Sequence, residues 1–217
     1  MKIHIIGCSG SGKTYLANAL SKKYNISHFD LDDIQWDNNA KEYGKKRTLD
    51  ERKALLQEIL YNNDEWIIEG VYYAWVHQCF DEADKIYVLD MPGYLYKSRI
   101  IMRSIKRKLG IQKGKRETLK SVYNLLKWTE TFQNKNLKEI RSILDRYDDK
   151  VIWLSRKKDV EKIILSNLFL HQVHQFMRTM KKFHLLKVIG WITLFHLMQQ
   201  QKRVENCYVI HIITYLI

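Results

Sequence analysis

The chain contains little that would divide it into independent parts. Pro92 is the only proline among 217 residues, and no stretch is rich in proline, glycine and serine together. No segment recurs at a fixed period, which excludes a repeat architecture. The length suits one α/β domain with an appendage, or two small domains.

Cysteine is equally scarce. Cys8, Cys79 and Cys207 lie far apart and form no C-x-x-C pair, which excludes a disulfide framework of the kind that staples small secreted domains. A signal peptide is not expected, because the first apolar strand begins at residue 2. These features predict a protein of the reducing cytoplasm.

Acidic residues are nearly missing from the last part of the chain. From Ser166 onward, Glu205 is the one acid against six Lys and Arg. The apolar run 183–198 has 16 residues and is interrupted by charge, so it is short for a membrane span. Two interpretations stay open for this tail, residues 166–217: a basic helix at a membrane surface, or an extension without function, such as an out-of-frame reading.

Basic residues are abundant, with a formal net charge of +13. Such a charge allows contact with nucleic acid or an anionic membrane. It also suits an enzyme whose substrates carry phosphate groups. Charge alone does not choose between these classes.

Glycine is also infrequent, yet three of the nine glycines fall within eight residues. These residues match the phosphate-binding pattern G-x-x-x-x-G-K-[ST] at every position: Gly7, Cys8, Ser9, Gly10, Ser11, Gly12, Lys13 and Thr14. The glycines let successive backbone N–H groups wrap a phosphate. We expect Lys13 to reach the β- and γ-phosphates of ATP and the Thr14 hydroxyl to bind Mg²⁺. Cys8 is expected as a small residue of the loop, although nearby amides could also lower its thiol pKa.

Apolar strands alternate with helical stretches on either side of this loop, the pattern of a parallel sheet covered on both faces. The strands are expected near residues 2–6, 26–29, 66–69, 85–90 and 151–154. The glycine loop joins the first strand to a helix over 15–24, which is the setting that a phosphate-binding loop requires. Thr48 and Glu51 form a capping box before a helix that reaches about Tyr61. Asn136 is expected to start another helix, which reaches about Tyr147.

About sixty residues separate the last two strands, more than one crossover helix needs. The surplus predicts a helical insertion, residues 94–133. Arg99, Arg103 and Arg107 recur every four residues and share one helix face. A basic segment with two glycines, 108–116, follows. We interpret the insertion as a lid that folds over bound phosphates, with a solvated basic helix face as the alternative for any single arginine.

The order and spacing of these motifs resemble the adenylate-kinase-related P-loop proteins, and within them the DNA topology modulation proteins. The resemblance covers residues 1–165 and rests on the glycine loop, Asp30–Asp33, Trp66–Tyr72 and Ala83–Asp90. It implies a P-loop NTPase fold with five parallel strands in the order 2-3-1-4-5. It also implies ATP and Mg²⁺ as ligands and phosphoryl transfer to a small acceptor.

The resemblance also implies roles for single residues. Asp32 would orient the acceptor, and Asp30 would lie near Mg²⁺. Glu69 would hold a magnesium-bound water, with a surface acid at a strand end as the alternative. Arg99 and Arg103 would stabilise charge during transfer, and Arg156 would border the adenine. After Gly70 the chain departs from the adenylate kinase pattern D-G-x-P-R, because it has no Pro-Arg there, which puts AMP in doubt as the acceptor.

These observations predict a small-molecule kinase in residues 1–165, followed by the tail. The acceptor would be a nucleotide, a nucleoside or a similar metabolite bearing a hydroxyl or phosphate group. A nucleic-acid-associated regulator that binds ATP is the alternative. A third reading is an ATPase that uses the tail at a membrane surface.

Overall fold

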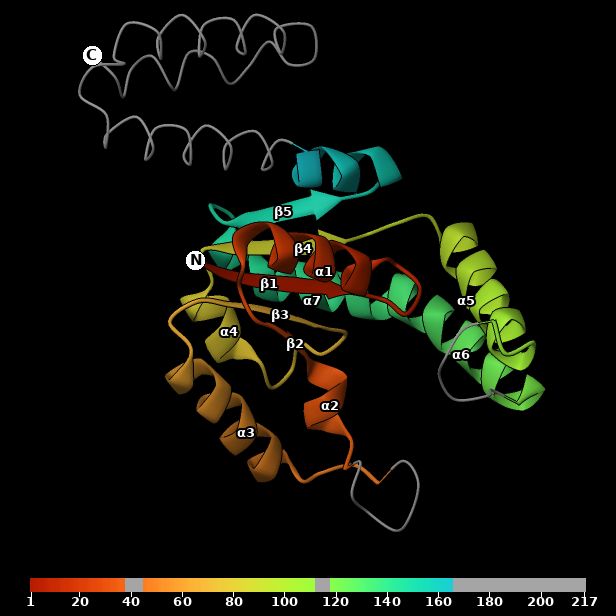
Figure 1. The fold of residues 1–217 in the computed structure, drawn as a ribbon, viewed down its shortest axis with the longest axis horizontal. Helices are drawn as coiled ribbons and strands as arrows, with labels where there is room; N and C mark the ends of the chain where they lie inside the picture. The colour runs from red at the N-terminus through yellow and green to blue at the C-terminus, as the bar shows by residue number, and fades with distance from the viewer. Residues whose placement is uncertain (38–44, 112–117, 166–217) are drawn as a thin grey trace, which may run out of the picture. The chain divides into compact units, whose positions relative to one another are not determined.

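The computed structural model describes residues 1–37, 45–111 and 118–165 (Figure 1). The tail 166–217 and the end of the basic segment, 112–116, which holds the second of its two glycines, lie outside the described residues, so the predictions for them remain open. The chain divides into two compact units, Met1–Ile164 and Leu165–Ile217. Within the described ranges, no helix combines the length and the apolar character needed to cross a membrane.

Five parallel strands form one sheet in the order β2-β3-β1-β4-β5, which confirms the predicted order. The strands are β1 (Lys2–Gly7), β2 (His28–Asp30), β3 (Trp66–Gly70), β4 (Lys85–Leu89) and β5 (Val151–Leu154). The central strand β1 is buried from Ile3 to Gly7, because helices cover both faces of a parallel sheet and leave its middle strands dry.

Helices cover the sheet on opposite faces (Figure 1). α1 (Lys13–Tyr24) lies with helical residues 157–165 on one face, where Lys23 Nζ donates to the Ile164 carbonyl at 3.0 Å. On the other face, the ring of Phe80 in α4 (His77–Glu82) packs edge-on against His4 of β1, with ring centroids 5.0 Å apart. Two further helices, α2 (Leu31–Gln35) and α3 (Leu49–Asn62), follow β2. The capping box predicted at Thr48 and Glu51 is present at the start of α3.

The helical insertion lies between β4 and β5, as predicted. Its elements are α5 (Gly93–Lys108), α6 (Leu119–Thr131), the π-helix η1 (Phe132–Asn136), α7 (Leu137–Leu144) and the 3₁₀ turn η2 (Asp145–Tyr147). α7 begins directly after Asn136 and η2 ends at Tyr147, as predicted, but Asn136 does not act as a cap. Its backbone is already helical, at φ −65° and ψ −36°, and its side chain makes no capping hydrogen bond. α6 therefore continues through η1 into α7 without an end at this point.

Candidate active site

The glycine loop joins β1 to α1 through backbone angles and close contacts that favour glycine. Gly10 and Gly12 have φ values of +79° and +106°, which residues with a side chain rarely adopt. At Gly7 the limit is space, because a Cβ there would lie 2.8 Å from Ser11 Oγ and 3.0 Å from Leu89 Cβ. The loop therefore lies at the positive end of α1, a position suited to an anion.

Lys13 lies at the start of α1 beside a buried carboxylate. Its Nζ donates to the Cys8 carbonyl at 3.3 Å and lies 3.8 Å from Glu69 Oε2. Glu69 is only 1% exposed, so the alternative of a surface acid at a strand end is wrong. The two residues meet because β3 is the neighbour of β1.

His28 of β2 also faces Glu69. Its Nε2 lies 3.4 Å from Glu69 Oε1. Burial alone would raise the pKa of Glu69, but the neighbouring side chains of His28 and Thr14 and the charge of Lys13 outweigh it and hold that pKa below its usual value. Glu69 therefore stays ionised at neutral pH.

Asp30 and Asp32 lie at the junction of β2 and α2 and have different partners. Asp30 Oδ1 accepts the Asp32 backbone N–H at 2.9 Å and caps α2. Burial raises the pKa of Asp30 to about 6, with further increases from the charges of Glu69 and Asp32. The Asp32 carboxylate accepts the Tyr72 hydroxyl at 2.7 Å. Asp30 is in register with Glu69, so its side chain points to the face of the sheet that carries Lys13.

Arg99 of α5, in the helical insertion, binds the backbone of the glycine loop. Its Nη1 donates to the carbonyls of Gly10 and Ser11, at 3.0 Å and 2.8 Å. The loop carbonyls that turn away from a phosphate are thereby paired with a cation. Arg103 is half-buried one turn further along the same helix. The structure thus places Arg99 against the loop backbone.

Two predicted residues lie away from this cluster. Arg156 follows β5, has a side chain 63% exposed and pairs with Asp159 at 2.9 Å. It makes no hydrogen bond or ion pair with the glycine loop among those seen in the described residues. Cys8 contributes backbone only, because its side chain is buried and burial raises the pKa of its thiol to about 11. The suggestion that loop amides lower this pKa is wrong.

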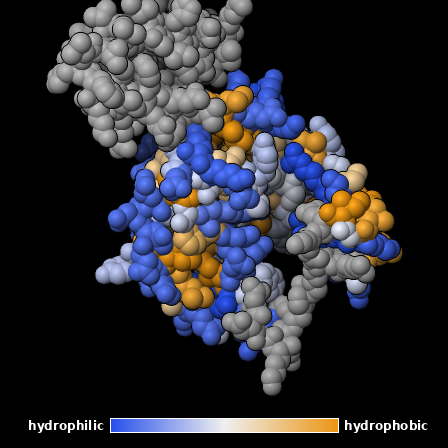
Figure 2. Space-filling model, in the orientation of Figure 1, coloured by the Kyte–Doolittle hydropathy of each residue, from blue (hydrophilic) through white to orange (hydrophobic). Residues whose placement is uncertain are grey.

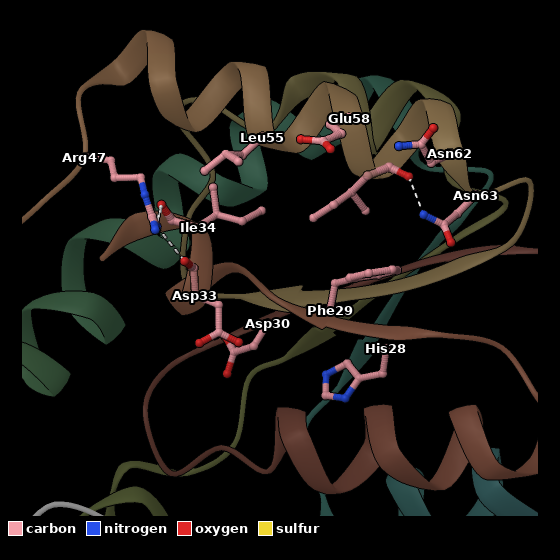
Figure 3. Close-up of a pocket in the computed structure, with 11 residues that line it drawn as sticks. His28, Phe29, Asp30, Asp33, Ile34, Arg47, Leu55, Glu58, Asn62 and Asn63 are labelled. Atoms are coloured by element: carbon pink, nitrogen blue, oxygen red, sulfur yellow. Dashed lines mark hydrogen bonds between the residues drawn. The ribbon is translucent and has the colours of Figure 1, made fainter. Parts of the chain in front are cut away.

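A cavity of about 450 Å³ lies beside the cluster, between β2, α2 and α3 (Figure 3). His28 and Asp30 line it and also belong to the cluster around Glu69. Phe29, Ile34 and Leu55 supply apolar wall. The cavity lies on the far side of these residues from α1 and offers space for a small molecule.

The cluster suits Mg²⁺ delivered together with ATP. The described residues contain no group of three or more His, Cys, Asp or Glu able to hold a metal by themselves. Mg²⁺ with a nucleotide needs no such cage, because phosphates and waters supply most ligands. Glu69 Oε1 is buried and accepts no hydrogen bond within the described residues, and the Thr14 side chain lies close enough to the same carboxylate to lower its pKa. Both would take part in holding the ion.

No protein-family model matches the chain. The chain is 29% identical over 140 residues to "Uncharacterized protein YqaC" of Bacillus subtilis (strain 168), which covers 64% of this chain and 76% of that protein. Two solved structures are similar in fold. A shikimate kinase from Acinetobacter baumannii in complex with shikimate has a TM-score of 0.48 and 18% identity, over 76% of this chain and 93% of its own. A gluconokinase from Sinorhizobium meliloti 1021 has a TM-score of 0.47 and 13% identity, over 84% and 97%.

Sequence reasoning missed two residues of the cluster, His28 and Tyr72. The signal for His28 was its spacing from Asp30, because residues two apart in a strand point to the same face. Tyr72 gave no such signal, since it follows β3 in an irregular segment. Its contact with Asp32 depends on the path of that segment in space.

Proposed function

We propose that the protein is an ATP-dependent phosphotransferase that moves the γ-phosphoryl group of ATP to a hydroxyl of a small molecule. The observation that carries the proposal is the position of Lys13 Nζ, between the loop carbonyl of Cys8 and the buried carboxylate of Glu69. A cation held at the mouth of a backbone cradle, beside an ionised carboxylate, matches the charges of a phosphate–magnesium pair.

The residues divide the work of transfer between them. The loop N–H groups and Lys13 bind and orient the phosphates, and Glu69 and Thr14 hold the ion. Magnesium, when bound with ATP, neutralises charge on the β- and γ-phosphates. Arg99 keeps the loop in shape, and Arg103 adds positive charge on the insertion side. Closure of the insertion over the site would exclude water and favour transfer over hydrolysis.

Asp30 is the best-placed proton acceptor in this proposal. It lines the cavity and shares the cluster with Glu69 and Lys13. Asp32 binds Tyr72 instead and positions the start of α2. In the transfer, the acceptor oxygen forms a bond to the γ-phosphorus while the bond to the bridging oxygen of ADP breaks. The hydroxyl proton passes to Asp30.

The test is Lys13→Ala, compared with Lys22→Ala. Lys22 is exposed on the same helix and serves as the matched control. We expect Lys13→Ala to weaken ATP binding at least tenfold and to stay folded, with a lower melting temperature because the buried carboxylate of Glu69 loses its neighbouring cation. Calorimetric titration with MgATP and thermal unfolding measure the two quantities. Unchanged ATP affinity in a folded Lys13→Ala protein would refute the proposal. ADP release that rises with added DNA or RNA, and with no small molecule, would favour the nucleic-acid-associated regulator.

A further inference from the structure

The outer face of α5 carries an exposed apolar stripe, which we call the α5 stripe. Its side chains recur at helical spacing and are 44% to 67% exposed: Ile101, Met102, Ile105 and Leu109. The opposite face of the helix buries Tyr96 and Ile100. Figure 2 shows apolar surface, in orange, at the right of the view, where Figure 1 places α5 and α6. Contiguous apolar surface on the outside of a protein marks a place where a partner binds.

Exposed aliphatic side chains gather in this insertion rather than over the whole surface. Leu119 of the neighbouring α6 is 84% exposed, and Ile111 just after α5 is 71% exposed. Among the exposed Leu, Ile and Met side chains of the described ranges, Leu49 and Leu165 are the exceptions that lie elsewhere. The insertion is therefore the part of the described chain best suited to an apolar contact.

The charge around the α5 stripe is positive. The sequence has no Asp or Glu between Asp90 and Glu117, and nine Lys and Arg in the same interval. Lys106 and Lys108 are exposed and lie on either side of the stripe on the helix surface. The stems of such lysines can lie along apolar surface while their ammonium groups reach anions at its edge. The charge therefore favours an anionic partner.

The residue types distinguish between the possible partners. Nucleic acid is bound through cations and aromatic stacking, and aliphatic side chains such as Ile101 and Ile105 add little to that. Protein interfaces are depleted in lysine, and two copies joined at this face would bring like charges together. An aliphatic stripe between lysines matches an anionic membrane surface, where apolar side chains enter the headgroup boundary and lysines attract lipid phosphates.

We infer that α5 binds the surface of an anionic phospholipid membrane, with the α5 stripe inserted at the headgroup boundary. This inference does not depend on the proposed function. The opposite face of the same helix packs on the glycine loop, where a Cβ at Gly10 would lie 3.3 Å from Ile100 Cγ1. The membrane contact therefore leaves the contact with the loop in place.

Co-sedimentation of the full chain with lipid vesicles tests the inference. Vesicles of phosphatidylcholine alone are compared with vesicles of equal parts phosphatidylcholine and phosphatidylglycerol. We expect binding to the mixed vesicles to be about tenfold tighter, because several lysines and arginines face the anionic lipid. Added salt should weaken this binding by screening the charges. A chain that does not bind the mixed vesicles would overturn the inference.

Paired variants distinguish the α5 stripe from the tail. Ile105→Gln combined with Leu109→Gln removes apolar surface and keeps every charge, so it should weaken binding to the mixed vesicles about tenfold. Met102→Gln with Ile105→Gln repeats the test if that protein fails to fold. Leu49→Gln with Tyr61→Gln is the matched control, because both residues are exposed on α3. It should bind like the original chain. An apolar variant that binds as well as the original chain would overturn the inference and assign the binding to the tail or to charge alone.

A second pair of variants tests the flanking charges. Lys106→Gln with Lys108→Gln should also weaken vesicle binding, whereas Lys53→Gln with Lys138→Gln removes the same charge from exposed positions of α3 and α7. Equal losses in the two pairs would overturn the placement on α5. Two further results would also overturn it. Binding of duplex DNA without vesicle binding would assign this face to nucleic acid. A dimer of the original chain that dissociates in the apolar variant, with vesicle binding unchanged, would assign the stripe to a second copy.

Discussion

At the scale of single residues, His4 is the least expected side chain in the sheet. It lies in the middle of β1 and is fully buried. Neither ring nitrogen has a hydrogen-bond partner in the described part of the chain, and the ring makes a T-shaped contact with the ring of Phe80. Burial without a partner lowers the pKa of His4 to about 3. A neutral, unsatisfied imidazole of this kind costs stability.

We predict that the free energy of unfolding depends less on pH in His4→Leu than in the original chain. The unfolded chain binds a proton at His4 near pH 6.5, while the folded chain does not until about pH 3. Protonation of the unfolded chain therefore lowers the free energy of unfolding as pH falls, by about 2 kcal/mol between pH 7 and pH 5. Urea unfolding of both proteins at the two pH values should show that this difference disappears in His4→Leu. His77→Leu, at an exposed histidine of α4, is the control. Its free energy of unfolding should still fall between pH 7 and pH 5. An identical acid loss in His4→Leu would contradict the assignment.

At the scale of elements, the close contact between β3 and α2 determines where Asp30 and Asp32 lie. A Cβ on Gly70 would lie 2.7 Å from Leu31 Cδ1 and 2.8 Å from Leu31 Cβ. Leu31 stands between Asp30 and Asp32 in the chain. The absent side chain at residue 70 therefore lets α2 start close to the end of β3.

We predict that Gly70→Ala destabilises the fold by about 1–3 kcal/mol, because the clash involves an atom tied to the backbone of α2. It should also lower turnover by displacing the two aspartates. Gly93→Ala is the comparison, since its new Cβ would meet the end of the flexible Gln133 side chain, which can turn away. Denaturant unfolding ranks the two variants. A larger loss in Gly93→Ala would show that the insertion packs more rigidly than β3 against α2.

Arg99 links two other elements, the glycine loop and α5. Removal of its two charged hydrogen bonds in Arg99→Ala should cost about 1.5–3 kcal/mol of stability and weaken MgATP binding through loss of loop shape. Lys106→Ala, at an exposed position of the same helix, should change neither. Denaturant unfolding measures the stability of both variants, and titration measures their affinity for MgATP. If Arg99→Ala lowers turnover alone, with affinity and stability intact, its role lies in the transition state.

The elements differ in how far the sequence predicts them. The strands follow from apolar runs, and the placement of Lys13 beside Glu69 follows from strand order, since β1 and β3 are neighbours. The join between α6 and α7 does not follow, because Asn136 has the residue type of a cap while the preceding turns hold its backbone helical. The contacts of His28 and Tyr72 depend on side-chain directions and loop paths that periodicity does not encode. The cavity is a property of packing between β2, α2 and α3, and no local pattern marks it.

At the scale of the whole molecule, the described residues through Ile164 contain every group assigned to nucleotide binding. The sheet, the glycine loop and the insertion all lie in the first compact unit. Leu165 is exposed at the end of the last described helix. The boundary predicted from the loss of acidic residues after this point can therefore be tested by truncation.

We predict that a chain ending at Leu165 folds, binds MgATP with unchanged affinity and is more soluble than the full chain. The reason is that the tail adds apolar and basic residues with one acid to balance them. Circular dichroism, ATP titration and sedimentation of both chains provide the measurement. An insoluble or ATP-inert truncation would show that residues 166–217 complete the core. Co-sedimentation of the full chain with anionic vesicles, absent in the truncation, would assign the tail to a membrane surface.

The packing of α5 on the glycine loop should couple the evolution of these two segments. A Cβ at Gly10 would lie 3.0 Å from the Tyr96 carbonyl and 3.3 Å from Ile100 Cγ1, and Arg99 holds the loop between them. Mutations in the loop and in the first two turns of α5 should therefore be accepted in evolution only together, although about ninety residues separate them in the chain. The set of residues that must change together is therefore larger than the eight-residue motif. A graft of residues 7–14 alone into another protein would leave behind the helix that keeps the loop in shape.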